Sequence, residues 1–315
     1  MIPRLALIGV GKFGINHLRT LQKLDDKKII KFVGFVEINS KIRNKIKNDF
    51  LIRSSDSIDD FVNDVDAFDI VTPPKTHYGL VKTLLNKNKD IFVEKPLALT
   101  WKESVELERM AQKKKLNLQV GHIFRHHPQI KFLKNFLKIP SNSPYYIKTR
   151  FLQKSMQKHE TGSIFVFLHG FDIIDNIIGK NPSKIFSIEN MHNSENKFEI
   201  NSSVNIFYPN LNVEVNVGWI PSGKFRDIEI FTKNRRIIAD LLTNEIKIFK
   251  NNKLEKKSVI LMKDEPLYTE LRFFSNNIKN RTFVENNIGS RIVKICELAT
   301  KSGKNKKLIN FNSSK

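Results

Sequence analysis

The sequence contains a single cysteine, Cys296, among 315 residues. One thiol cannot form an internal disulfide, and it leaves too few thiolates for a cysteine-rich metal site. No apolar run approaches the roughly 18 residues that span a bilayer. The opening apolar run from Leu5 to Gly9 has no small-residue cleavage site and leads into a glycine-rich turn, so it is interpreted as a strand rather than a signal peptide. These absences predict a cytoplasmic protein with no internal disulfide and no membrane span.

Acidic residues are scarce beside basic ones: 32 Asp and Glu against 54 Lys and Arg give a net charge of +22. Such a surplus can attract nucleic acid or an acidic membrane surface. However, the lysines are spread along the chain, and Phe (24) far outnumbers Tyr (5) and Trp (2), as AT-rich codons favour. We therefore interpret the charge as compositional drift and expect no nucleic-acid or membrane partner. Attraction of an anionic substrate, such as a nucleotide sugar, stays open.

The length predicts two domains. In the first, residues 1–122, strand and helix patterns alternate, which predicts a parallel sheet with crossover helices. Thr100 is expected to cap a helix, with Glu103 completing a capping box. The expected strands are 5–10, 32–36, 68–71, 91–93 and 118–120, and the expected helices are 13–24, 77–86 and 100–114.

The pattern changes in the second domain, residues 123–315, where repeated short strands from 184 to 250 are typical of an antiparallel sheet. The fold class is therefore α/β: an N-terminal Rossmann sheet and a C-terminal α/β domain with a mostly antiparallel open sheet. Such a sheet has one face for helices and one that needs covering, so we expect a homodimer or homotetramer. Helices are expected at 129–137, 164–178, 266–278 and 288–300, with a loop at 140–144.

A glycine-rich motif, Gly9-Val10-Gly11-Lys12-Phe13-Gly14, fits G-x-G-x-x-G between a strand and a helix. Its glycines permit a tight turn, close approach of a pyrophosphate and close helix packing, while the helix N-terminus offers free N–H groups to phosphates. Glu37 ends the second strand, 23 residues after Gly14, where an acidic side chain binds ribose hydroxyls and repels a 2′-phosphate. NAD is thus predicted over NADP. The alternative is that the glycines serve only the turn and Glu37 is a solvated strand end.

Glu94-Lys95-Pro96 follows the strand at 91–93, at the edge where α/β sheets place ligands. With these motifs the chain resembles the Gfo/Idh/MocA family of glucose–fructose oxidoreductases and inositol dehydrogenases, which implies an NAD-dependent dehydrogenase acting on a sugar hydroxyl. Further motifs carry the resemblance: His17, Thr72-Pro73-Pro74 with His77, and Gly121-His122 with Arg125 and Pro128. Residues 219–221 with Lys224 and Arg226, and 265–267 with Glu270 and Leu271, are similar to the nucleotide-sugar and surface-polysaccharide branch. The implied NAD contacts are Gly9, Gly11, Lys12, Phe13, Gly14, Glu37, Thr72, Pro73, His77, Glu94 and Lys95.

The resemblance also implies that Lys95 lies beside the nicotinamide and the substrate hydroxyl. Oxidation of an alcohol needs a hydride acceptor and a group that takes the hydroxyl proton. A lysine near its usual pKa of about 10.4 is a poor base, which burial and the positive nicotinamide would improve and Glu94 would oppose. His169, in the family's helix, is implied to relay the proton or bind the hydroxyl. The alternatives are a surface lysine before a turn proline and a histidine packed in an apolar helix.

The chain departs from the family pattern at Phe165, since the family commonly has an aspartate one helical turn before the histidine. Either Glu160 or Asp172 substitutes, or Lys95 acts with His169 alone, or the protein is a non-catalytic NAD-binding sensor or scaffold.

The resemblance implies a substrate pocket lined by Lys95, His122, Arg125 and His169. Arg125 suits a carboxylate or phosphate on the sugar, or a structural salt bridge. His122, His126 and His127 lack an acidic neighbour in their segment, so no metal site is expected.

Overall fold

A computed structural model describes residues 2–154, 161–190, 198–261, 264–283 and 287–312. The chain divides into two compact units. The first comprises Met1–Ile123 and Asp264–Val293, and the second comprises Phe124–Lys263 and Lys294–Lys315. The sequence assigned everything after residue 122 to the second domain. The difference is the segment containing helix α9 (Pro266–Lys279), which returns to the first unit.

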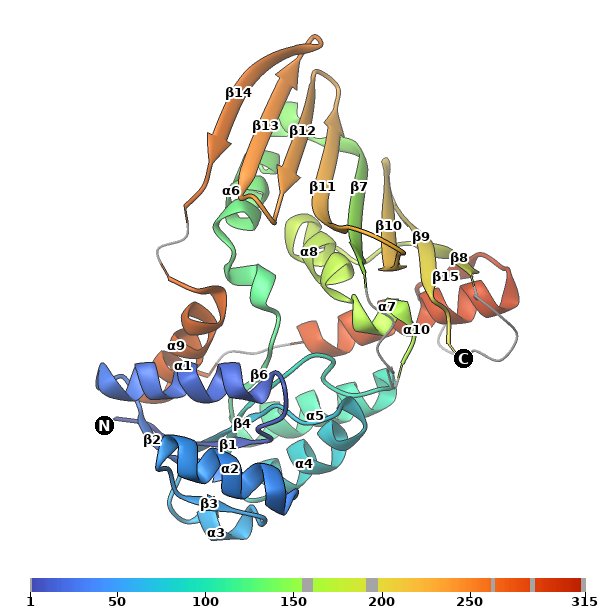
Figure 1. Cartoon of the computed structure of the whole chain (residues 1–315). Helices are drawn as coiled ribbons and strands as arrows, with labels where there is room; N and C mark the ends of the chain where they lie inside the picture. Colours follow the sequence, from blue (N-terminus) through green and yellow to red (C-terminus); the bar gives the residue numbers. More distant parts are fainter. Residues whose placement is uncertain (1, 155–160, 191–197, 262–263, 284–286, 313–315) are drawn as a thin grey trace. The chain divides into compact units, whose positions relative to one another are not determined.

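The first unit contains a six-stranded parallel sheet in the order β3-β2-β1-β4-β5-β6 (Figure 1). The strand order reverses between β1 and β4, as in doubly wound nucleotide-binding sheets. This confirms the predicted Rossmann fold. The strands are β1 (Arg4–Ile8), β2 (Lys31–Val36), β3 (Ser54–Ser55), β4 (Ala67–Ile70), β5 (Asp90–Val93) and β6 (Leu118–Val120).

Helices cover both faces of this sheet because strand residues alternate between two apolar clusters. Leu18 and Leu21 of α1 and Phe274 of α9 pack on one face, whereas Leu84 of α4 and Leu107 of α5 pack on the other (Figure 1). The hydroxyl of Thr100 accepts a hydrogen bond from the Glu103 N–H at 3.2 Å, so α5 begins where the cap predicted. The helices are α1 (Gly14–Asp26), α2 (Ser40–Phe50), α3 (Asp59–Val62), α4 (Pro74–Asn86) and α5 (Trp101–Lys114).

The second unit is built on a nine-stranded sheet in the order β14-β13-β12-β11-β7-β10-β9-β8-β15. The pair β7 and β10 is parallel and the other pairs are antiparallel, which confirms the predicted mostly antiparallel sheet. The strands are β7 (Pro144–Gln153), β8 (Lys184–Asn190), β9 (Asn201–Tyr208), β10 (Leu211–Trp219), β11 (Lys224–Thr232), β12 (Arg235–Asp240), β13 (Glu245–Lys250), β14 (Lys253–Val259) and β15 (Ile309–Asn310).

The predicted buried helix at 164–178 is two helices, α7 (Ser163–Val166) and α8 (His169–Ile178), separated by a turn at Phe167 and Leu168. Helix α8 lies close to the sheet, because a Cβ on Gly170 would stand 3.0 Å from Val215 Cγ1. The turn places both Phe167 and Leu168 in the core. Two further helices are α6 (Pro128–Leu137) and α10 (Ile288–Asn305), and the division between the units falls within α10.

Within the described ranges, no helix has both the length and the apolar character required to cross a bilayer.

Candidate active site

The candidate site lies at the carboxyl ends of the first unit's parallel strands. Strand β1 is followed by Gly9 to Gly14, β4 by Thr72 and Pro73, and β5 by the segment 94–96. Because β1, β4 and β5 are parallel neighbours, these three segments meet at one edge of the sheet. This edge, at the reversal of strand order, is where doubly wound folds bind ligands.

Two of the motif glycines are required by close backbone contacts. Gly9 has a φ of +93°, and a Cβ there would lie 2.5 Å from the Val71 carbonyl oxygen. A Cβ on Gly14 would lie 2.2 Å from the Gly9 carbonyl oxygen. A Cβ on Gly11, in contrast, would have no described atom within 4 Å. The loop is therefore closed against the protein at both ends and open at its middle glycine.

The N-terminus of α1 is open beside this loop. Phe13 at the N-cap makes no side-chain capping bond, its side chain is 47% exposed, and Lys12 is exposed beside it. Free N–H groups of a helix N-terminus and an unfilled glycine cradle suit a pyrophosphate. The residues present thus fit a dinucleotide.

Glu37 lies immediately after β2, beside the glycine loop. Its carboxylate accepts hydrogen bonds from the N–H of Val10 at 3.2 Å and from the N–H of Asn39 at 2.9 Å. Arg43 donates to the Glu37 carbonyl oxygen at 2.7 Å. A carboxylate has about four lone-pair sites, so these two bonds fix its position and leave acceptor capacity for ribose hydroxyls.

His77 does not offer its ring to the open site, contrary to the expected cofactor contact. The ring is fully buried, with Nδ1 2.7 Å from the Pro96 carbonyl oxygen and Nε2 2.9 Å from the Thr72 carbonyl oxygen. His77 therefore joins the segments that follow β4 and β5, and it acts on the site through the backbone it holds. The side chain of Thr72 bonds that of Thr76 at 2.7 Å, while Pro73 is exposed at the start of α4.

Lys95 is half-buried at the end of β5, and its N–H donates to Glu94 Oε2 at 3.2 Å. The other oxygen, Glu94 Oε1, lies 3.2 Å from Nε2 of His17, and Nδ1 of His17 lies 2.8 Å from Oδ2 of Asp69. A buried chain of ionisable groups thus runs from β4 to the base of Lys95. Sequence reasoning used His17 only as part of a motif and took Asp69 for a strand residue, although a carboxylate within an apolar parallel strand is itself a signal.

Burial opposes protonation of His17, but the charge and hydrogen bond of Asp69, followed by those of Glu94, raise the His17 pKa to about 10. Burial would raise the pKa of Glu94, yet the hydrogen bond and charge of His17, with the charge of Lys95, lower it. Burial raises the pKa of Asp69, against the charge of His17. The imidazolium form of His17 is therefore the one that the fold stabilises.

This raised pKa predicts a pH-dependent stability. A histidine whose pKa is higher in the folded state stabilises the fold fully below its unfolded value of about 6.5, and this contribution is lost as pH rises towards about 10. Between those limits the folded state holds one extra proton, worth about 1.4 kcal/mol per pH unit. Urea unfolding of the wild type should lose stability with pH more steeply than His17→Gln by roughly that slope. Parallel curves for the two proteins would contradict the assignment.

In the second unit, His169 is the first residue of α8 and is half-buried. Its ring packs edge-on against Phe124, with centroids 5.1 Å apart, and lies 6.4 Å from the ring of Phe151. Phe165 is on the separate helix α7, so the expected spacing of one turn on a continuous helix does not hold here. Phe165 and His169 are therefore on different helical segments.

Arg125 forms a double ion pair with α8. Its Nε donates to Asp172 Oδ1 at 2.5 Å and its Nη2 to Asp175 Oδ2 at 2.6 Å, and both aspartates are buried. Burial raises the pKa of Asp172 to about 6 against the charge of Arg125. Asp172 is therefore engaged with Arg125, which favours the structural reading of both side chains. Glu160, the other substitute, lies outside the described residues.

The three neighbouring histidines have separate surroundings. His122 is buried after β6 in the first unit, and His127 caps α6 by accepting from the Gln129 N–H at 3.3 Å. Burial lowers the pKa of both His126 and His127. Over the described parts of the chain, no group of three or more His, Cys, Asp or Glu side chains is arranged to hold a metal ion.

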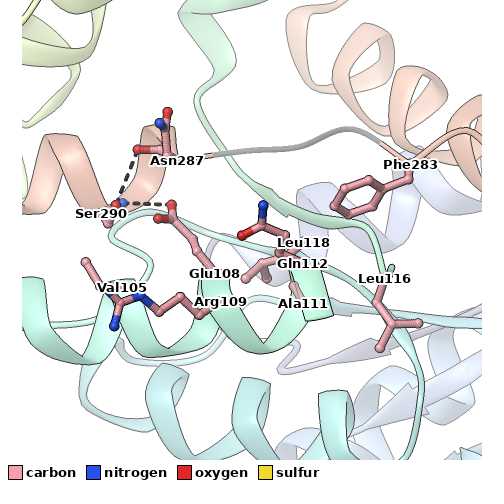
Figure 2. Close-up of a pocket in the computed structure, with 10 residues that line it drawn as sticks. All are labelled: Val105, Glu108, Arg109, Ala111, Gln112, Leu116, Leu118, Phe283, Asn287 and Ser290. Atoms are coloured by element: carbon pink, nitrogen blue, oxygen red, sulfur yellow. Dashed lines mark hydrogen bonds between the residues drawn. The ribbon is translucent and has the colours of Figure 1, made fainter. Parts of the chain in front are cut away.

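A separate cavity of about 280 Å³ opens between α5 and the start of α10, where Glu108 accepts a hydrogen bond from the Ser290 N–H at 2.9 Å (Figure 2). It borders the amino end of β6, and the site residues above do not line it. Its lining residues are Val105, Glu108, Arg109, Ala111, Gln112, Leu116, Leu118, Phe283, Asn287 and Ser290.

Comparison with known proteins supports this geometry. Residues 3–122 match the model of an oxidoreductase family with an NAD-binding Rossmann fold. A UDP-N-acetylglucosamine 3-dehydrogenase from Acidithiobacillus ferrooxidans is 31% identical over 124 residues, 39% of this chain and 40% of that protein. An inositol 2-dehydrogenase/D-chiro-inositol 3-dehydrogenase from Shouchella clausii is 32% identical over 133 residues, 40% of this chain and 37% of that protein. The matches thus span about two fifths of these relatives' lengths.

Solved structures extend the likeness in fold to nearly the whole chain. That of the Acidithiobacillus ferrooxidans dehydrogenase has a TM-score of 0.85 at 22% identity, covering 96% of this chain and 98% of that one. An oxidoreductase from Agrobacterium radiobacter, solved in complex with NAD+, L-tartaric acid and magnesium, has a TM-score of 0.85 at 17% identity and covers 99% of both chains.

Proposed function

We propose that the protein is an NAD-dependent dehydrogenase of the Gfo/Idh/MocA kind, acting on a ring hydroxyl of a sugar, because residues 3–122 match the model of that oxidoreductase family's NAD-binding Rossmann fold. The position of Lys95, at the end of β5 on the edge that carries the glycine loop, carries this proposal. A nucleotide sugar is the proposed substrate class. The 31% identity over 124 residues to a UDP-N-acetylglucosamine 3-dehydrogenase supports this class.

The bound cofactor would supply the hydride acceptor. Lys95 would take the hydroxyl proton at Nζ, and the charge of Lys95 in turn helps to keep Glu94 ionised. His169 would bind the reacting hydroxyl as an auxiliary group. Glu37 would accept the adenosine ribose hydroxyls, and the open loop at Gly11 would admit the pyrophosphate.

The direct experiment combines the purified protein with NAD and a panel of UDP-sugars, beginning with UDP-N-acetylglucosamine, and of inositols. Absorbance at the NADH band reports turnover, and calorimetry reports NAD binding. NAD binding without turnover across the panel would favour the second candidate, a non-catalytic NAD-binding sensor or scaffold, which Phe165 in place of an aspartate supports. Failure to bind any pyridine nucleotide would overturn both.

Glu37→Ala tests the cofactor preference. Loss of hydrogen bonds to a charged acceptor costs about 1.5–3 kcal/mol, so NAD affinity should fall about tenfold or more. The preference for NAD over NADP should narrow, because the variant lacks the carboxylate that would repel a 2′-phosphate. Calorimetry with both nucleotides measures this, with exposed Asp49→Ala of α2 as the control. An unchanged ratio of affinities would remove Glu37 from the ribose site.

The proposal includes a cytoplasmic location, in keeping with the single, buried thiol of Cys296. It also includes a homodimer or homotetramer through the face of the nine-stranded sheet opposite α8. Along β7, Ile147 and Phe151 are buried, whereas Lys148 and Arg150 on the opposite face are partly exposed. Light scattering should give the mass of two or four chains, and the mass of one chain would contradict this part.

A further inference from the structure

The side chains of Asp69 in β4, His17 in α1 and Glu94 after β5 lie in contact with one another. We propose that Asp69, His17 and Glu94 form a positioning chain that holds an ionised carboxylate beside Lys95 and thereby sets how tightly Lys95 keeps its proton. The consequence for catalysis rests on the proposed function. The charge state of the chain does not, because it is a property of the protein without substrate.

The geometry requires a doubly protonated ring. Both nitrogens of His17 face carboxylate oxygens, at 2.8 Å from Asp69 and 3.2 Å from Glu94, and carboxylates only accept hydrogen bonds. The side chains of His17 and Asp69 have no exposure, and that of Glu94 is 14% exposed. Charges of alternating sign therefore follow one another from Asp69 to Lys95, and each has an opposite neighbour in a site largely closed to water.

Stability alone does not account for this chain. Replacing buried ion pairs by apolar side chains of similar volume is often neutral or stabilising. Moreover, among the described residues, the second oxygen of Asp69, Oδ1, is buried without a hydrogen-bond partner, an arrangement that costs free energy. Clusters of this kind that lie at the rim of a ligand-binding edge are candidates for a functional role.

The surroundings fix the carboxylate of Glu94 in place. A Cβ on Gly121 would stand 2.8 Å from Glu94 Oε1 and 3.0 Å from Glu94 Cδ, so the glycine after β6 makes room for this side chain. The ring of His17 is held between Phe13, 5.2 Å away, and Phe92, 6.0 Å away. Phe13 belongs to the glycine loop. The three ionisable side chains therefore connect that loop to the backbone of Lys95.

The pKa shifts of His17 and Glu94 agree in direction with this geometry, whereas burial raises the pKa of Asp69. The two carboxylates raise the pKa of His17 against its burial, and His17 with Lys95 lowers the pKa of Glu94 against its burial. Helix α9, which packs against α1 and β5, brings one more buried carboxylate, Glu270, into this unit. Because Glu270 is buried in the same unit, the control for a non-specific effect of carboxylate charge is the exposed Asp49 of α2.

Nuclear magnetic resonance of the protein without substrate tests the first half of the chain. With ¹⁵N-labelled histidine, His17, assigned by its absence from His17→Gln, should remain doubly protonated through pH 8. Asp69→Asn should lower its titration midpoint by more than one pH unit, since it removes the principal counter-charge. A wild-type His17 that titrates near its usual value of about 6.5 would overturn the proposal.

Lysine labelled at ¹³Cε tests the second half, with the Lys95 resonance assigned by its absence from Lys95→Met. Glu94→Gln removes the adjacent negative charge and should lower the Lys95 titration midpoint by about one pH unit. Glu94→Asp keeps the charge and should retain most of the wild-type midpoint, and Asp49→Asn, at an exposed position of α2, should leave it unchanged. A midpoint that Glu94→Gln does not move would refute the chain even if the protein is an active dehydrogenase. Conversely, if the panel of sugars shows no turnover, these titrations still test the charge state of the three side chains, because they are measured without substrate.

Discussion

Replacing Lys95 by methionine should reduce sugar-dependent NADH formation by about 10²- to 10⁴-fold, the usual contribution of a positioned acid or base. Methionine has a similar length but cannot accept the hydroxyl proton. NAD binding should persist, because the glycine loop and Glu37, which hold the cofactor in our proposal, lie after other strands. Calorimetry with NAD and initial rates at saturating NAD separate the two properties.

Lys95→Arg separates the ability of Lys95 to accept the hydroxyl proton from the effect of its positive charge on Glu94. Arginine keeps a positive partner beside Glu94, but it stays protonated at any accessible pH and so cannot act as the base. We expect it to lose turnover as methionine does while preserving stability better, since the charge of Lys95 helps to lower the pKa of Glu94. Lys113→Met, an exposed lysine of α5, is the control. Full turnover in Lys95→Met, with NAD bound, would remove Lys95 from the mechanism.

The tight turn of the glycine loop was predictable because its constraints are local. The contact between Gly14 and the Gly9 carbonyl oxygen joins residues of one short turn, and the turn lies between a strand and a helix whose apolar patterns are clear. The place of Glu37 after β2 was predictable for the same reason, since it directly follows an apolar strand.

The positioning chain was not predictable, because its contacts join residues 52 and 77 positions apart. The sequence shows Asp69 within an apolar strand, but only the packing of α1 on the sheet shows which base it meets. Helix α2 was not predicted either, because it buries only Ile46 and its sequence therefore shows little apolar periodicity.

Two errors of organisation have a similar origin. A segment that is apolar all round gives no sign of where its helix ends, so the turn at Phe167 and Leu168 was missed. Leu271 and Phe274 of α9 form an ordinary amphipathic pattern, which indicates a buried face but not the domain on which that face packs. Membership of the first unit depends on tertiary contacts that the pattern does not encode.

Gly11→Ala and Gly14→Ala should separate two requirements of the glycine loop, which are close packing against the protein and room for the pyrophosphate. A Cβ on Gly14 would stand 2.2 Å from the Gly9 carbonyl oxygen, a backbone atom that no rotamer change can move aside. Gly14→Ala should therefore lower stability by about 1–3 kcal/mol, the range for overpacked sites, and reduce NAD affinity at least 100-fold because α1 must shift from β1.

Gly11→Ala should leave stability within about 0.5 kcal/mol of the wild type, since its Cβ would have no described atom within 4 Å. It should still lose NAD affinity, because the methyl group stands where the pyrophosphate approaches the backbone. Urea unfolding with and without NAD measures both effects, since a ligand that binds only the folded state stabilises it by RT ln(1 + [NAD]/Kd). Gly79→Ala, at an exposed and uncrowded position of α4, is the matched control and should be slightly stabilising. A Gly11→Ala protein that NAD stabilises as fully as the wild type would show that the pyrophosphate does not lie over this loop.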